Sequence, residues 1–174
     1  MKIIAFAASS SLQSINKQLA GYVANLVGGA SVELLDLNDY ELPLYSPERE
    51  AELGQPKLAK AFFEKLASAD AIVVSYAEHN GTYTAAYKNL FDWVSRIDRA
   101  VFHKKPMIAL ATSPGPGGAK TVLAQAVESA PHFAADIKAS VSVPSFFDNF
   151  DTEKQVFTNK NIAAKLQQAA EALL

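Results

Sequence analysis

The chain has 174 residues, enough for one domain with a full hydrophobic core, and it contains no cysteine, which excludes disulfides, thiolate metal sites and cysteine nucleophiles. Its formal net charge of −2 and its isoelectric point near 5.9 give no sign of a nucleic-acid or anionic-membrane partner. No apolar run approaches the ~18 residues of a membrane helix, and the run from Met1 to Phe6 is too short for a signal peptide, so we expect a cytoplasmic protein.

The chain opens with a predicted strand over residues 3–7 and a predicted helix over residues 14–27. The strand is an unbroken apolar run, which is typical of a central parallel strand covered on both faces. Between the two elements lies a cluster of hydroxyl side chains: Ser9, Ser10, Ser11 and Ser14. A polar turn before a helix start presents backbone N–H groups and a positive dipole end to an anion, so this stretch predicts a phosphate site. The alternative interpretation is an ordinary serine-capped helix.

The rest of the chain alternates between strands and helices. The apolar patterns predict four further strands, over residues 32–35, 71–75, 107–111 and 140–143. They predict four further helices, over residues 57–67, 85–97, 119–129 and 160–174. Five alternating pairs imply a parallel sheet with helices on both faces, and the absence of linkers and repeats indicates one doubly wound α/β domain over residues 1–174.

Two stretches have no regular pattern. Residues 36–56 contain three prolines and form an irregular connection whose length favours a function or a subunit contact, although a surface excursion with short turns is the alternative. Residues 146–157 are acidic and aromatic, and we expect them to be irregular as well.

Three polar loops follow the carboxyl ends of predicted strands. They cover residues 9–16, 76–83 and 112–118, and they are rich in hydroxyls, amides and glycine. In a doubly wound sheet, ligands bind beyond the carboxyl ends of the strands, at the switch point of the strand order. The three loops therefore predict a single ligand site.

These loops also carry recognisable motifs. The first loop fits the pattern Gly-Ser-x-Arg-x-x-Ser-x-Asn-x-x-Leu at Ser9, Ser14, Asn16 and Leu19, and departs from it at Ala8 and Ser11. The second fits Pro-Glu-Tyr-Asn-Gly-Ser-Tyr-Pro, with Leu-Lys-Asn-Ala-Leu-Asp-Trp after it, at these positions: Glu78, Asn80, Gly81, Tyr83, Lys88, Asn89, Asp92 and Trp93. The third fits Lys-Pro, then Ser-Pro-Gly-x-x-Gly-Gly, at Lys105, Pro106, Ser113, Pro114, Gly115, Gly117 and Gly118.

With these motifs the chain resembles the flavodoxin-like NAD(P)H-dependent FMN reductases, which include quinone, azo-dye and chromate reductases. The resemblance spans nearly the whole chain and implies a flavodoxin-like five-stranded sheet with strand order 2-1-3-4-5. It implies an enzyme with FMN as cofactor, NADPH or NADH as electron donor and a small molecule as electron acceptor. It also implies a homodimer or a homotetramer.

The resemblance assigns FMN-binding residues to all three loops. Those around the phosphate are Ser9, Ser11, Leu12, Gln13, Ser14 and Asn16. Those along the isoalloxazine ring are Tyr76, Glu78, His79, Asn80, Gly81, Ser113 and Gly115. No catalytic side chain is expected, because the flavin carries the hydride chemistry. The acidic residues show no metal-ligand spacing, so we expect no metal.

Several motif residues have a structural interpretation as well. We expect Glu78 to act as a loop hydrogen-bonder, Trp93 as a core or subunit contact, and Lys88 and Asp92 as a solvated helical ion pair.

Two other functions stay open at this point. One is an electron carrier that docks to proteins, although carriers usually have a more acidic surface. The other is a flavodoxin-like interaction module without flavin, which the departures at Ala8 and Ser11 allow.

Overall fold

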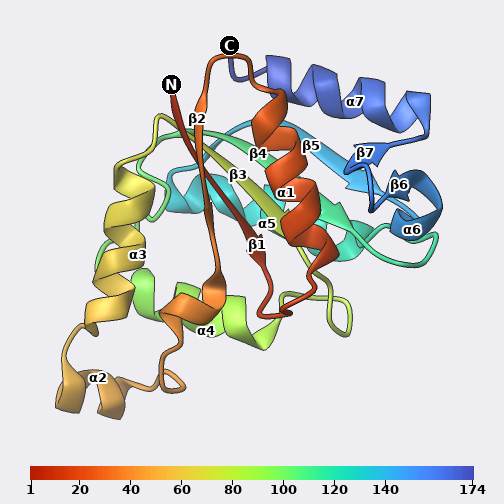
Figure 1. Ribbon diagram of the computed structural model, residues 1–174. Helices are drawn as coiled ribbons and strands as arrows, with labels where there is room; N and C mark the ends of the chain where they lie inside the picture. Colours follow the sequence, from red (N-terminus) through yellow and green to blue (C-terminus); the bar gives the residue numbers. More distant parts are fainter.

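The computed structural model describes residues 1–174, and at its centre is a parallel five-stranded sheet (Figure 1). The strands are β1 (Lys2–Ala8), β2 (Ser31–Leu35), β3 (Ala71–Tyr76), β4 (Pro106–Thr112) and β5 (Asp136–Val143). Their order is β2-β1-β3-β4-β5, with every neighbouring pair parallel. The predicted flavodoxin-like sheet and its strand order are confirmed.

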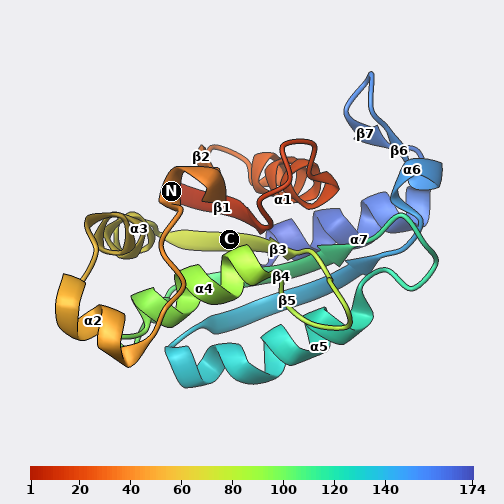
Figure 2. The same ribbon diagram turned by 90° about the horizontal axis from the view of Figure 1, so that it is seen from below.

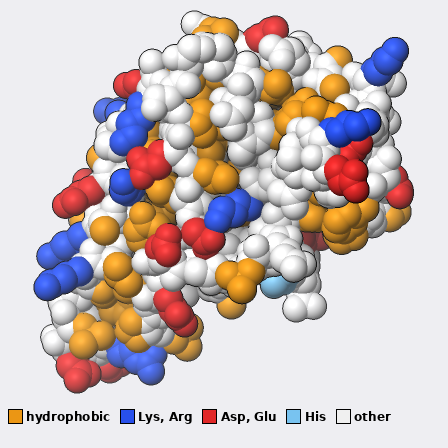
Figure 3. All heavy atoms as spheres, in the orientation of Figure 1, with side chains coloured by type: hydrophobic (Ala, Val, Ile, Leu, Met, Phe, Trp, Pro, Cys, Tyr) orange, Lys and Arg blue, Asp and Glu red, His pale blue; other side chains and the backbone are white.

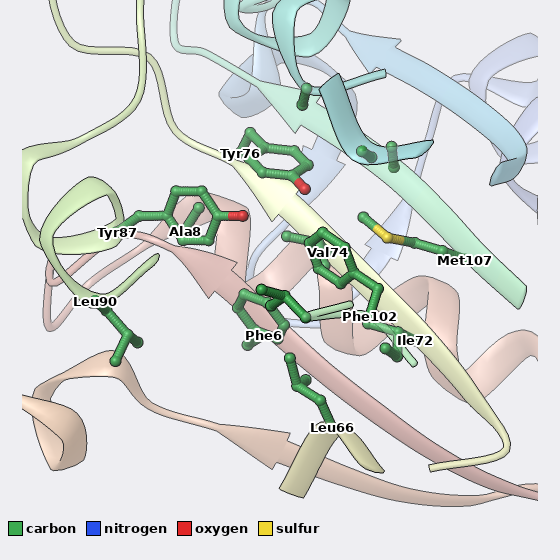
Figure 4. Close-up of a cluster of buried hydrophobic side chains, with 14 of the residues drawn as sticks. Phe6, Ala8, Leu66, Ile72, Val74, Tyr76, Tyr87, Leu90, Phe102 and Met107 are labelled. Carbon is green, nitrogen blue, oxygen red and sulfur yellow. The ribbon is translucent and has the colours of Figure 1, made fainter. Parts of the chain in front are cut away.

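Helices cover both faces of the sheet (Figure 2). On one face, α1 (Ile15–Leu26) and α7 (Lys160–Glu171) enclose a core of 19 buried residues. On the other, α3 (Lys57–Ala67), α4 (Ala85–Val94) and α5 (Lys120–Ser129) enclose a core of 26. This second core contains the large rings drawn in Figure 4, among them Phe6, Tyr76, Tyr87 and Phe102. None of the helices is long and apolar enough to cross a lipid bilayer.

The edge strand β5 is longer than predicted. The sequence predicted it only over residues 140–143, but it begins at Asp136. Along the first half of the strand, exposed and half-buried residues alternate, and Lys138 pairs with Asp136 at 2.7 Å. An edge strand with one solvated face has charged residues in its pattern, which hides it from a search for apolar runs.

The connection over residues 36–56 is also more regular than predicted. It contains a short 3-10 helix, η1 (Leu37–Tyr40), and α2 (Pro47–Leu53). Ser46 caps α2, and Pro47 occupies its first turn. The Trp93 side chain is fully buried and its indole N–H donates to the Pro43 carbonyl at 2.7 Å, which fastens this segment to α4 and confirms Trp93 as a core residue.

The aromatic stretch after β5 folds into short elements. They are α6 (Phe146–Asn149) and a hairpin of β6 (Phe150–Asp151) with β7 (Val156–Phe157). The sequence pattern had predicted that residues 146–157 are irregular. The rings of Phe146, Phe150 and Phe157 pack on one another, with centroid separations of 4.8–6.1 Å. Another short 3-10 helix, η2 (Ala130–Phe133), joins α5 to β5.

Candidate functional site

The three polar loops meet in one cleft of about 300 Å³ at the carboxyl ends of β1, β3 and β4. Its lining residues are Ser9, Ser11, Gln13, Ser14, Ile15, Asn16, Ala77, Glu78, His79, Thr112, Ser113, Pro114 and Phe147. The switch point of the strand order lies between β1 and β3, which is where a doubly wound sheet holds its ligands.

In the loop after β1, serine hydroxyls accept hydrogen bonds from nearby backbone amides. Ser9 Oγ accepts from the Ser11 amide at 3.1 Å, and Ser11 Oγ accepts from the Gln13 amide at 3.3 Å. Ser14 Oγ caps α1 by accepting from the Lys17 amide at 3.1 Å. Each hydroxyl keeps its own proton, so the three serines remain available as donors to an anion.

Further donors come from the backbone at the start of α1. The amides of Leu12, Ile15 and Asn16 donate to no acceptor in the protein. The positive end of the α1 dipole coincides with the amides of Ile15 and Asn16. This donor set fits a phosphate group.

The Asn16 side chain has a different role from the one expected. It is 3 % exposed, and its Oδ1 accepts from Ser75 Oγ at 2.7 Å and from the Thr112 amide at 3.1 Å. Its Nδ2 donates to the Thr112 carbonyl at 3.2 Å. The side chain therefore joins α1 to β3 and β4, and it leaves the backbone N–H and the second Nδ2 proton of Asn16 without an acceptor in the protein. Sequence reasoning did not identify Ser75.

Tyr76 also differs from the expectation. Its side chain is 1 % exposed and packs against Tyr83 and Tyr87 on the α4–α5 side of the sheet, away from the cleft. The pleat of β3 gives the reason, because Tyr76 shares a face with Ile72 and Val74 while Ser75 points to the other face. Burial raises the pKa of the Tyr76 hydroxyl above its ordinary value.

The loop after β3 ends in a tight turn. His79 and Thr82 exchange two backbone hydrogen bonds, and the two residues between them have positive φ, 53° at Asn80 and 78° at Gly81. Two successive residues with positive φ make a type I′ turn, for which Asn-Gly is the preferred pair. The amides of Asn80 and Gly81 make no hydrogen bond within the protein.

Glu78 fixes this loop to a helix. Its carboxylate accepts from the Val122 amide at 2.8 Å, in the first turn of α5, where a negative charge is favourable. This contact confirms Glu78 as a loop hydrogen-bonder. His79 is exposed and lines the cleft.

The loop after β4 is held by the segment that follows β5. Ser113 Oγ donates to the Gly115 carbonyl at 3.0 Å, while the carbonyls of Gly115 and Ser113 accept from the amides of Ser145 and Phe146. The next residue, Phe147, is 61 % exposed and borders the cleft. Sequence reasoning missed Phe147. The doublet Phe146-Phe147 after Pro144 is a signal for an exposed ring, because only one of two adjacent rings can enter the core.

No lysine or arginine lines the cleft, so an anion there meets hydroxyls, backbone amides and the His79 ring. The nearest basic residue of the loop, Lys17, forms a 2.5 Å ion pair with Asp36. Acidic and basic side chains are interspersed on the face seen in Figure 3. The structure contains no group of three or more side chains arranged as metal ligands.

A larger hollow of about 590 Å³ lies along the outer side of α1, next to the cleft. It is open, and its walls come from α1 and its neighbours rather than from converging loops. The smaller cleft, where the loops of three strands meet, is therefore the candidate ligand site.

Comparison with known proteins identifies the family of this chain. The sequence pattern of the NADPH-dependent FMN reductase family matches residues 1–148. A 2-hydroxy-1,4-benzoquinone reductase from Burkholderia sp is 34% identical over 127 residues, which is 72% of this chain and 66% of that protein. An NAD(P)H-dependent FMN reductase from Pseudomonas aeruginosa is 36% identical over 87 residues, 50% of this chain and 45% of that protein. The chain thus spans about half to two thirds of the length of these curated relatives.

Solved structures share the fold. The flavoenzyme NAD(P)H:acceptor oxidoreductase FerB from Paracoccus denitrificans superposes with a TM-score of 0.77 at 23% identity, over 99% of this chain and 94% of that one. An azoreductase from Bacillus anthracis gives a TM-score of 0.65 at 17% identity, over 99% of both chains. At these identities the likeness concerns the fold, whereas the family match rests on sequence over most of the chain. The chain belongs to the NADPH-dependent FMN reductase family.

Proposed function

We propose that this protein is an FMN-dependent oxidoreductase that takes electrons from NADPH or NADH and reduces quinones, azo compounds or similar small acceptors. The observation that carries the proposal is the convergence of three donor-rich loops in one cleft at the switch point of the sheet. Bound FMN would supply the redox chemistry, accepting a hydride from the nicotinamide and passing electrons to the acceptor in a separate half-reaction.

The loop after β1 would hold the FMN phosphate. Its donors are the hydroxyls of Ser9, Ser11 and Ser14 and the amides at the start of α1. Leu12 contributes its backbone N–H, whereas the Gln13 amide already donates to Ser11, so Gln13 contributes its side chain. Because these donors are neutral, we expect FMN to bind weakly and to dissociate in part during purification.

The two other loops would hold the isoalloxazine ring. The free amides of Asn80 and Gly81 are suited to hydrogen-bond the ring edge, where negative charge accumulates on reduction. Glu78 keeps this turn in place through α5. Ser113 lines the cleft and donates to the Gly115 carbonyl, so we propose that this loop faces the ring as well. His79 borders the cleft, but hydride transfer to a flavin needs no protein base.

The test is an anaerobic absorbance experiment on the FMN-loaded protein. NADPH or NADH should bleach the flavin band, and a quinone should restore it. If dithionite reduces the bound FMN while neither nucleotide does, the protein is an electron carrier. If FMN produces neither fluorescence quenching nor a thermal shift, the interaction-module interpretation replaces ours.

We further propose that the protein works as a homodimer or a homotetramer, on the grounds of its sequence resemblance to the family. Sedimentation velocity across a range of concentrations tests this, and a monomer at high micromolar concentration would contradict it.

A further inference from the structure

Phe147 is an aromatic residue at the border of the candidate FMN cleft, and neither the motifs nor the proposed function gives it a role. It is the only exposed residue among the phenylalanines, tyrosines and tryptophan of the chain. A single exposed apolar side chain is ordinary in itself, so what matters is where the protein holds this ring.

The backbone before Phe147 is fixed to the loop after β4. The Ser145 amide donates to the Gly115 carbonyl at 2.9 Å. The Phe146 amide donates to the Ser113 carbonyl at 3.0 Å. Figures 1 and 2 both show this loop running out beside α6. The loop after β4 is one of the two that we propose to face the isoalloxazine ring, so Phe147 is attached to the ring side of the cleft.

The short helix α6 is fastened from its other end as well. Asn149 Nδ2 donates to the carbonyls of Pro144 and Ser145 at 3.0 and 3.1 Å. The side chain of Phe146 is fully buried in the core on the α1–α7 face of the sheet. The rings of Phe146 and Phe147 are 5.5 Å apart and nearly perpendicular, at 87°. Because the first ring is anchored in the core, the second is held at the cleft and does not float in solvent.

The chain adopts a strained conformation to place this ring. Ser145 has φ of 46° and ψ of 58°, in the left-handed region that a residue with a Cβ adopts only at a cost. Such strain persists where the surrounding contacts over-determine the backbone, and it clusters at ligand sites. Here the strained residue makes the turn between β5 and α6, after which Phe147 borders the cleft.

The cleft also has a need that Phe147 meets. An isoalloxazine ring is flat and aromatic, and it binds well where an apolar or aromatic side chain covers one of its faces. Tyr76 cannot do so, because its ring lies on the other side of the sheet. Phe147 is the only phenylalanine, tyrosine or tryptophan among the lining residues.

We propose that the Phe147 ring packs against the isoalloxazine ring of bound FMN and shields it from water. The inference rests on the proposed FMN site and adds to it a contact that depends on the flavin ring alone. Since the donors of the loop after β1 are neutral, a contact with the ring should carry a large share of the affinity.

The test compares FMN with riboflavin, which has the same ring and no phosphate, in fluorescence titrations. Phe147→Ala should weaken the binding of both flavins by about tenfold and by the same factor. Phe147→Trp keeps an aromatic face, so it should bind both at least as tightly as the wild-type protein. Phe147→Leu keeps apolar bulk without an aromatic face, so its affinities should lie between those of Phe147→Ala and the wild-type protein.

Val156→Ala is the control, because Val156 is exposed on the neighbouring hairpin and does not line the cleft. It should leave both affinities unchanged. Thermal unfolding without flavin separates binding from stability. Because Phe147 is 61 % exposed, Phe147→Ala should unfold close to the wild-type midpoint, and its loss of affinity then reports the lost contact.

Four results would overturn the proposal, and three of them leave the FMN site intact. Unchanged flavin affinity in Phe147→Ala would show that the ring does not touch the flavin. A loss confined to FMN would place Phe147 at the phosphate. Wild-type affinity in Phe147→Leu would show that no aromatic contact exists. If the wild-type protein bound neither flavin, the proposed function would fail together with this inference.

Discussion

Asn16 and Thr112 lie 96 positions apart, and each donates one hydrogen bond to the other. The Thr112 amide donates to Asn16 Oδ1 at 3.1 Å, and Asn16 Nδ2 donates to the Thr112 carbonyl at 3.2 Å. Both residues are buried, and the same Oδ1 also accepts from Ser75. One side chain thus holds together the carboxyl ends of β3 and β4 and the start of α1, from which the three loops of the cleft emerge.

Asn16→Ala should therefore destabilise the protein and weaken FMN binding together. The change leaves the Thr112 amide and carbonyl and the Ser75 hydroxyl buried without this partner, for a loss of about 3 kcal/mol in the free energy of unfolding. Asn25→Ala is the matched control, because Asn25 is exposed on α1 and bonds only within its own helix. Urea unfolding measures both variants, and equal small losses would show that the Asn16 network is not a stabilising feature.

A second prediction concerns acid stability. The Lys17 ammonium, followed by the Asn38 amide, lowers the pKa of Asp36 below its ordinary value of 3.8. A carboxyl with a lowered folded-state pKa stabilises the fold at pH values above its unfolded pKa, and this contribution is lost as the pH falls through the folded pKa. Lys17→Met should thus cost about 0.5–1 kcal/mol at neutral pH and low salt, and progressively less below the unfolded pKa.

The control for that prediction is Lys60→Met, which removes the same charge from an exposed helix position without an ion pair. Its unfolding free energy should differ little from that of the wild-type protein at any pH. Urea titrations at several pH values provide the measurement. A Lys17→Met penalty that is independent of pH would argue against a role for the Asp36 pair.

The central strands could be predicted from the sequence because each is a short apolar run that the sheet buries on both faces. The start of β5 could not, since Asp136 and Lys138 lie on a solvated edge. The cleft could be placed from the three loops, because the carboxyl ends of parallel strands share one edge of the sheet. The side-chain role of Asn16 could not, because it depends on partners 59 and 96 positions away.

The direction of Tyr76, in contrast, was predictable from alternation. Ile72, Val74 and Tyr76 occupy every second position of β3 and face α4 and α5, so the ring had to leave the cleft. The motif resemblance identifies a loop and does not give the direction of each side chain in it.

Gly118 provides a third prediction, on the loop after β4. Its φ is +61°, and a Cβ there would lie 2.4 Å from Ser142 Oγ and 3.1 Å from the Pro144 nitrogen. Gly118→Ala should cost about 2 kcal/mol or more, from strain at positive φ and from the clash. Gly117→Ala has open space and no positive φ, so its unfolding midpoint should stay close to that of the wild-type protein. Equal thermal midpoints for the two variants would contradict the geometry of this loop.

The last prediction concerns Ser11, which lines the cleft where the family pattern has arginine. Serine offers one neutral donor, whereas arginine can fork onto a phosphate with a fixed charge. A charge-assisted hydrogen bond contributes about 1.5–3 kcal/mol, so Ser11→Arg should tighten FMN binding by about tenfold or more at low salt. The gain should shrink at high salt because of screening, and riboflavin, which lacks the phosphate, should gain much less.

Ser10→Arg is the control for Ser11→Arg, since it adds the same charge at the neighbouring exposed residue, which does not line the cleft. Fluorescence titrations of FMN and riboflavin at two salt concentrations separate the outcomes. Similar gains in FMN affinity for both variants would indicate long-range electrostatic attraction only. An equal gain in riboflavin affinity would show that the FMN phosphate does not bind at this loop. Unchanged FMN affinity in Ser11→Arg would mean that the serines after β1 serve only to cap α1, with the phosphate bound elsewhere.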